Sequence, residues 1–154
     1  MPRTDSAALL IRAEPRRVFA ALVDEAALVE WLPPRGMVGR FERFDARPGG
    51  SYRLVLTRTD GGTGKSSADS DVAEVRFVEL VPDERLVQAV DFEADDPAFR
   101  GTMTMTWKLT PAPDGTLLEV RADDVPSGIS AEDHVAGMES SLANLARFLE
   151  REGS

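Results

Sequence analysis

The sequence contains no cysteine, only one histidine, only Lys65 and Lys108 as lysines, and no long run of apolar residues. The absence of cysteine excludes a disulfide framework, a thiol nucleophile and a thiolate metal site. A single histidine without cysteine also argues against a dedicated zinc or iron site, so we expect neither a metal nor a cofactor. No apolar run approaches the length that spans a bilayer, and we therefore expect no membrane insertion.

The charge balance is acidic, with a formal net charge of −9 from 27 Asp and Glu against 18 Lys and Arg. Nucleic acids and anionic membranes favour a basic protein surface, so neither is an expected partner. The 154 residues are long enough to bury a sizeable core, and we expect one domain over 1–154. The first residues lack the apolar stretch of a secretory signal, which favours the cytoplasm. The oligomeric state stays open, and a homodimer is one alternative.

The clearest pattern is a long amphipathic helix predicted over 130–152. Ser130 precedes Asp133 by three residues, which is a typical N-cap spacing. Apolar residues then recur at intervals of three and four along one face of the helix: Val135, Met138, Leu142, Leu145 and Leu149. Such a stripe must pack against another layer of the protein.

The rest of the chain is dominated by strand patterns. The sequence predicts a first strand over 4–13 and two short helices, one from Pro15 to Val23 and one over 26–31. Further strands are expected, separated by turn residues and by loops at 59–71 and 95–97, over 37–47, 51–59, 72–81, 86–93, 101–110 and 116–124. We therefore predict an α+β helix-grip fold, in which a strongly curved antiparallel sheet of about seven strands wraps around the long C-terminal helix. The two short helices would close one end.

Several segments resemble the START-like (SRPBCC) helix-grip superfamily, and more narrowly bacterial proteins similar to the activator of heat-shock protein 90 ATPase. The segments that carry this resemblance are 13–22, 31–34, 44–52, 81–86, 115–118 and 134–149. The resemblance implies a cavity for a hydrophobic ligand between sheet and helix, but no catalytic constellation. In this family the last helix commonly carries Gly followed by Trp, whereas this chain has Gly137 and Met138. Methionine is more pliable than an indole, so a roomier or more adaptable pocket is expected if Met138 faces the cavity.

The leading hypothesis is a binding protein for a hydrophobic or amphipathic small molecule. Its motivation is a set of inward-facing methionine, aromatic and leucine residues, together with the only histidine. For any single member, and for Trp31 in particular, simple core packing is the stronger interpretation. The predicted ligand-binding residues are Trp31, Tyr52, Leu54, Phe77, Phe92, Met103, Met105, Trp107, His134 and Met138.

Two alternatives remain open. One is an enzyme of the polyketide cyclase or hydratase kind that would use His134, Tyr52 or Arg47 in the same cavity. The sequence offers no nucleophile-elbow motif and no Ser-His-Asp triad, so we assign no catalytic residue; we expect Arg47 to pair with a nearby carboxylate. The other alternative is a co-chaperone-like interaction module, which would require an exposed apolar patch on the outside of the sheet.

Overall fold

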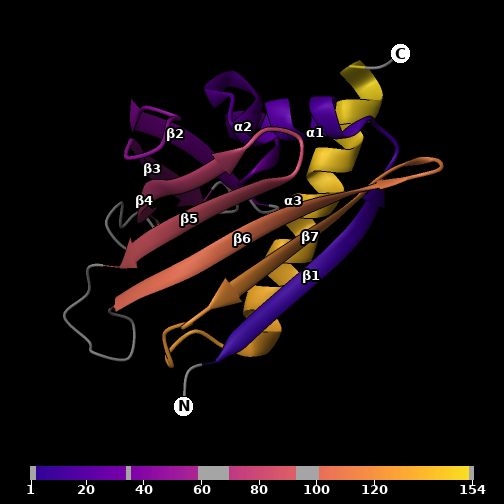
Figure 1. Ribbon diagram of the computed structural model, residues 1–154. Coiled ribbons are helices and arrows are strands. Elements are labelled where there is room, and N and C mark those ends of the chain that lie inside the picture. Colours follow the sequence, from indigo (N-terminus) through magenta and orange to yellow (C-terminus); the bar gives the residue numbers. More distant parts are fainter. Residues whose placement is uncertain (1–2, 34–35, 59–69, 93–100, 153–154) are drawn as a thin grey trace.

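A seven-stranded antiparallel sheet and three helices make up the computed structural model, which describes residues 3–33, 36–58, 70–92 and 101–152 (Figure 1). In chain order the elements are β1 (Thr4–Ile11), α1 (Pro15–Leu22), α2 (Glu25–Trp31), β2 (Met37–Phe44), β3 (Ser51–Arg58), β4 (Ser70–Val81), β5 (Arg85–Phe92), β6 (Gly101–Ala112), β7 (Gly115–Asp123) and α3 (Ala131–Glu152). Most of the predicted loop 59–71 and the loop at 95–97 lie outside the described residues.

The strand order is β1-β7-β6-β5-β4-β3-β2, and each neighbouring pair is antiparallel. Strands β2 to β7 follow one another as a meander, whereas β1 joins the sheet at the far side, next to β7. The sheet curls, α3 crosses one of its faces, and α1 and α2 lie near one end of α3 (Figure 1). This arrangement confirms the helix-grip fold predicted from the sequence. None of the helices in the described ranges is long and apolar enough to cross a membrane.

The local sequence signals explain where the elements begin and which face they bury. Ser130 Oγ accepts a hydrogen bond from the Asp133 backbone N–H at 3.2 Å, which confirms the predicted N-cap of α3. Pro15 occupies the first turn of α1, where its missing N–H costs no helix hydrogen bond. In β6, Met103 and Trp107 are buried while Thr110 on the other face is exposed, as the period of two predicts.

Strand β2 contains an irregularity that the sequence pattern does not reveal. Its register with β3 shifts between Phe41 and Arg43, which places an extra residue in β2. The shift allows Phe41 and Phe44 to reach the same inner face despite their odd spacing. Their ring centroids lie 5.1 Å and 5.8 Å from that of Tyr52, and Phe44 also contacts Phe77 at 6.2 Å. This aromatic cluster (Phe41, Phe44, Tyr52 and Phe77) fills the inner face near the β2 edge of the sheet.

The two ends of α3 are fixed by polar contacts to elements far away in the sequence. Near the first turn, Asp5 Oδ2 of β1 lies 2.8 Å from His134 Nδ1. Near the last turn, Arg17 of α1 donates a hydrogen bond to the Leu149 carbonyl oxygen at 2.7 Å. That carbonyl is one of the last four of the helix, which have no partner within the helix itself.

The middle of α3 is fixed to the segment that follows α2. Ser141 Oγ donates to the carbonyl oxygen of Leu32 at 2.8 Å. Asn144 Nδ2 donates to the carbonyl oxygens of Trp31 and Pro33 at 3.3 Å and 3.1 Å. These bonds satisfy backbone carbonyls at the end of α2, which have no N–H partner within the helix.

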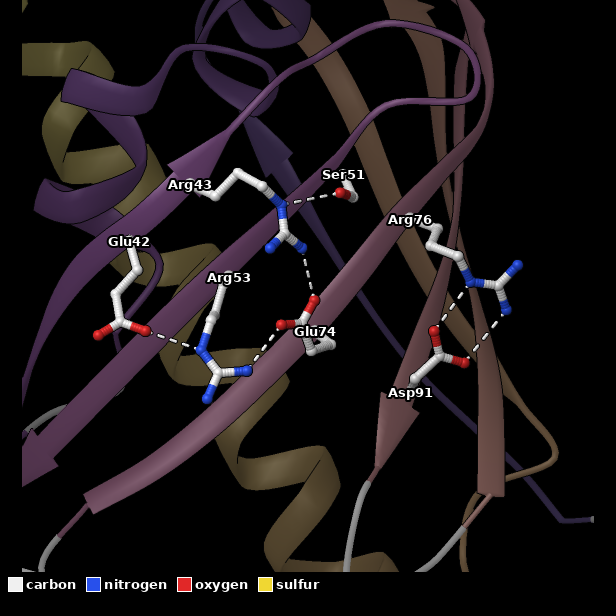
Figure 2. A network of polar contacts seen from close by, with 7 residues as sticks. All are labelled: Glu42, Arg43, Ser51, Arg53, Glu74, Arg76 and Asp91. Atoms are coloured by element: carbon white, nitrogen blue, oxygen red, sulfur yellow. Dashed lines mark hydrogen bonds and ion pairs between the residues drawn. The ribbon is translucent and has the colours of Figure 1, made fainter.

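The outer face of the sheet, opposite α3, carries a network of ion pairs across β2 to β5 (Figure 2). Glu74 on β4 accepts hydrogen bonds from Arg43 and Arg53, each at 2.7 Å. Arg76 pairs with Asp91 on the next strand at 2.8 Å and 3.1 Å. Exposed ion pairs contribute only about 0–1 kcal/mol each, so the network keeps this face polar rather than holding the fold together.

A single buried hydroxyl connects the end of β1 to the start of β7. Thr116 is fully buried, and its Oγ1 donates to the Ala13 carbonyl oxygen at 2.7 Å. The substitution Thr116→Val preserves the shape but leaves that carbonyl without a partner, so we expect a loss of about 1–3 kcal/mol in the free energy of unfolding. Urea denaturation measures it. The matched control is Thr110→Val on the exposed face of β6, for which a change within about 0.5 kcal/mol is expected; equal effects for the two variants would contradict this role of Thr116.

Candidate functional site

A cavity of about 280 Å³ lies between the inner face of the sheet and the first three turns of α3. Its sheet wall is made by inward-facing residues of β3, β4, β5 and β6, and most of its lining side chains are apolar. On the helix side, Asp133 is exposed while Met138 is buried. The cavity therefore reaches solvent beside the first turn of α3 and extends inward along the helix.

Most of the residues predicted from the sequence line this cavity. They are Tyr52, Leu54, Met103, Met105, Trp107, His134 and Met138. Two predicted residues are placed elsewhere: Trp31 is fully buried behind Trp107, and Phe77 belongs to the aromatic cluster. Both belong to the hydrophobic core and are not among the residues that line the cavity. The side chain of Phe92 lies outside the described part of the chain.

The cavity also has lining residues that the sequence interpretation did not select, namely Leu32, Leu56, Ala73, Val75, Gln88, Val90, Asp133, Gly137 and Ser141. The apolar ones follow from the same period-two pattern as Leu54 and Met103. The sequence could have predicted an inward position for Gln88, because it shares a strand face with Leu86 and Val90. A polar residue at such a position points inward and must find a hydrogen-bond partner there.

Gln88 finds that partner on the neighbouring strand. Its side chain is 5% exposed, and its Oε1 accepts a hydrogen bond from Trp107 Nε1–H at 2.9 Å. Trp31 packs edge-on against Trp107, with 5.9 Å between ring centroids, and donates its own Nε1–H to the Ala21 carbonyl oxygen at 2.9 Å. The indole of Trp107 is therefore held in place by the hydrogen bond to Gln88 and by the packed ring of Trp31.

The polar group at the helix end of the cavity is His134, which is paired with Asp5. The Asp5 carboxylate is 4% exposed and also accepts hydrogen bonds from Arg3 at 3.2 Å and 3.1 Å. Burial alone would raise the pKa of Asp5, but the hydrogen bonds from His134 and Arg3 outweigh it, and the pKa is lowered. Asp5 is therefore ionised at neutral pH. Since an ionised carboxylate can only accept, His134 Nδ1 carries the proton of this hydrogen bond.

The enzyme alternative would use His134, Tyr52 and Arg47, and the structure brings only the first two together. His134 and Tyr52 both line the cavity. Burial raises the pKa of Tyr52, and the opposing effect of its hydrogen bond with Gln88 is smaller, so its hydroxyl is neutral at ordinary pH. Arg47 lies elsewhere: its Nε is 2.8 Å from Asp45 Oδ2 in an exposed turn, which confirms the expected pairing.

Comparison with known protein families identifies the family to which the chain belongs. The sequence profile of the activator of Hsp90 ATPase homologue 1-like proteins matches residues 12–150. The chain belongs to this family. The match runs from the end of β1 almost to the end of α3, so it includes both walls of the cavity and confirms the resemblance seen in the sequence.

Solved structures of similar proteins agree with this assignment. A protein of Chromobacterium violaceum is 33% identical to the chain, with a TM-score of 0.85 and 96% of each chain covered. An AHSA1-like protein of Aeromonas hydrophila is 19% identical, with a TM-score of 0.76 and coverage of 98% of this chain and 94% of that one. A protein of Mesorhizobium loti, 22% identical, has a TM-score of 0.75 over 97% of this chain and 98% of its own. The last two show the fold alone. No curated protein of described function matches the chain.

For this family member, the buried Asp5 carboxylate predicts a specific response to acid. Its ordinary pKa is 3.8, and the folded-state pKa is lower. Ionisation of Asp5 therefore stabilises the fold at pH values above its ordinary pKa. That contribution is lost as the pH falls through the pKa that Asp5 has in the folded state. The variant Asp5→Asn lacks it. We expect the difference in the free energy of unfolding between wild type and Asp5→Asn to shrink as the pH falls from about 5 to about 2, as measured by urea denaturation. A difference that stays constant over this range would contradict the prediction.

Proposed function

We propose that the protein binds a small hydrophobic or amphipathic molecule in the cavity between α3 and strands β3 to β6. The observation that supports the proposal is the cavity itself, which combines an apolar lining with a few inward polar groups and an opening beside the first turn of α3. Small-molecule sites in proteins have this composition, because apolar walls provide affinity and a few polar atoms fix orientation.

The size of the cavity limits the ligand. A volume of about 280 Å³ lies just below the range of about 300–1,000 Å³ that is typical of ligand pockets. We therefore expect a compact molecule, such as one or two fused rings, rather than a long-chain lipid. Three methionines in the walls, Met103, Met105 and Met138, can adapt to ligands of different shape.

The outer face of the sheet offers less support for a protein-binding function. The ion-pair network in Figure 2 occupies this face across β2 to β5. In the described ranges, the large apolar side chains that are exposed are Leu10, Val38, Val72 and Val78, which come from β1, β2 and β4. An interaction module would gather such residues into one patch, so we place the function in the cavity.

Gly137 provides a test that does not weaken the fold. It lines the cavity in the second turn of α3, and a Cβ added there would meet no atom within 4 Å. The substitution Gly137→Phe fills part of the cavity, and we expect it to weaken ligands found in a thermal-shift screen of compact ring compounds by about tenfold or more. Val90→Phe, on the opposite wall, fills the same space from the sheet. Titration calorimetry measures the dissociation constants.

Gly137→Ala is the matched control. It adds only a methyl group and removes a helix-weakening glycine, so it should stabilise the protein by about 0.5–1 kcal/mol and leave binding nearly unchanged. A loss of affinity in Gly137→Phe together with an unchanged melting temperature then reflects a filled cavity. If Gly137→Phe and Val90→Phe both bind the screened compounds as well as wild type does, the ligand site is not this cavity.

A further inference from the structure

The helix end of the cavity carries a hydrogen-bonding atom that the fold does not use. His134 lines the cavity, and its Nδ1 is engaged by Asp5 Oδ2 at 2.8 Å. The two nitrogens of an imidazole point in divergent directions, so Nε2 lies on the side of the ring turned away from Asp5. No hydrogen bond between described residues involves Nε2, and no buried side-chain nitrogen or oxygen among them lacks a partner. Nε2 is therefore an atom that solvent or a ligand can reach.

The deeper polar groups of the cavity are already engaged with the protein. Gln88 Oε1 accepts from Trp107 Nε1–H, and the Gln88 side chain also hydrogen-bonds with Tyr52. The Ser141 hydroxyl donates to the Leu32 carbonyl oxygen. The carboxylate of Asp133 also borders the cavity, but this residue is exposed at the rim, where water solvates it. Each of these deeper groups makes at least one hydrogen bond within the protein, whereas His134 Nε2 makes none with the described residues.

The contacts of Asp5 determine what Nε2 can do. The carboxylate is ionised and also accepts two hydrogen bonds from Arg3. When the imidazole of His134 is neutral, the contact with Asp5 therefore keeps its single proton on Nδ1. In that tautomer Nε2 has a lone pair and no hydrogen. Nε2 of the neutral ring accepts a hydrogen bond, and a ligand must supply the donor.

We propose that His134, oriented by Asp5, selects ligands that carry a hydrogen-bond donor, such as a hydroxyl group, at one end of an apolar body. The inference rests on the proposed function, since the apolar body occupies the cavity while its donor meets Nε2 beside the first turn of α3. A ligand without the donor would exclude solvent from Nε2 and leave this nitrogen without a hydrogen bond. Sites built around a polar partner discriminate strongly against analogues that lack it. Asp5 is a positioning residue, because it acts through the tautomer of His134.

The test uses two probes of the same shape, 2-naphthol and 2-methoxynaphthalene, which differ in whether the oxygen carries a hydrogen. Titration calorimetry or fluorescence gives both dissociation constants for each variant. Wild type should prefer the naphthol by about tenfold. His134→Phe should bind both probes with similar affinity. Asp5→Asn should weaken the preference, because an amide can present either its oxygen or its NH₂ to Nδ1 and no longer imposes one tautomer.

Glu132→Gln is the matched control, since Glu132 is an exposed carboxylate in the same first turn of α3 that does not line the cavity, and this variant should keep the preference. Binding of the methyl ether by His134→Phe shows that this variant retains a folded cavity. If wild type binds both probes with equal affinity, the proposed selection by His134 is wrong, but the proposed binding function is retained. If the preference survives in His134→Phe, another group makes the hydrogen bond and the assignment is overturned. If wild type binds neither probe, the proposed function for compact ring compounds fails together with the inference.

Discussion

Helix α3 is held over the sheet by polar contacts at both ends and in its middle, and the cavity exists because of where these contacts hold it. Asp5 fixes the first turn to β1, and the carbonyls that follow α2 fix the middle through Ser141 and Asn144. A single helix in this position cannot cover seven strands at close-packing distance. The side chains that β3 to β6 direct inward leave a space of about 280 Å³ between the sheet and the helix, so the curled sheet forms the wall of a cavity.

The walls of the cavity owe their rigidity to residues that do not line it. Trp31 fixes the ring of Trp107 from behind, and Phe77 with its aromatic neighbours fixes the ring of Tyr52. Rings packed edge-on are more favourable than their buried area alone accounts for, by about 0.5–1.5 kcal/mol per pair. The aromatic end of the cavity is therefore preformed, whereas the methionines on the sheet and on α3 provide a wall that can adjust.

The sequence predicts the elements of this structure better than it predicts the cavity. Alternation along β6 correctly turns Met103, Met105 and Trp107 inward, because a period of two is a property of the strand alone. Whether a buried aromatic borders empty space depends on what other elements place in front of it, and Trp31 is as apolar as Trp107. The bulge in β2 leaves no trace in a hydrophobic pattern. The Asp5–His134 pair joins residues 129 positions apart, and only the addition of β1 beside β7 brings them together.

That pair links the stability of the fold to the chemistry of the site. His134 anchors the first turn of α3 through Nδ1 and also lines the cavity, so the proposed ligand would meet the same residue that anchors the helix. Met138, one turn further along the same face, is buried and lines the cavity. A fixed polar acceptor beside a pliable apolar wall allows recognition of a chemical group without recognition of one exact shape. A ligand that pairs with Nε2 adds a contact only in the folded state, and it therefore stabilises the segment of α3 that the Asp5 contact already holds.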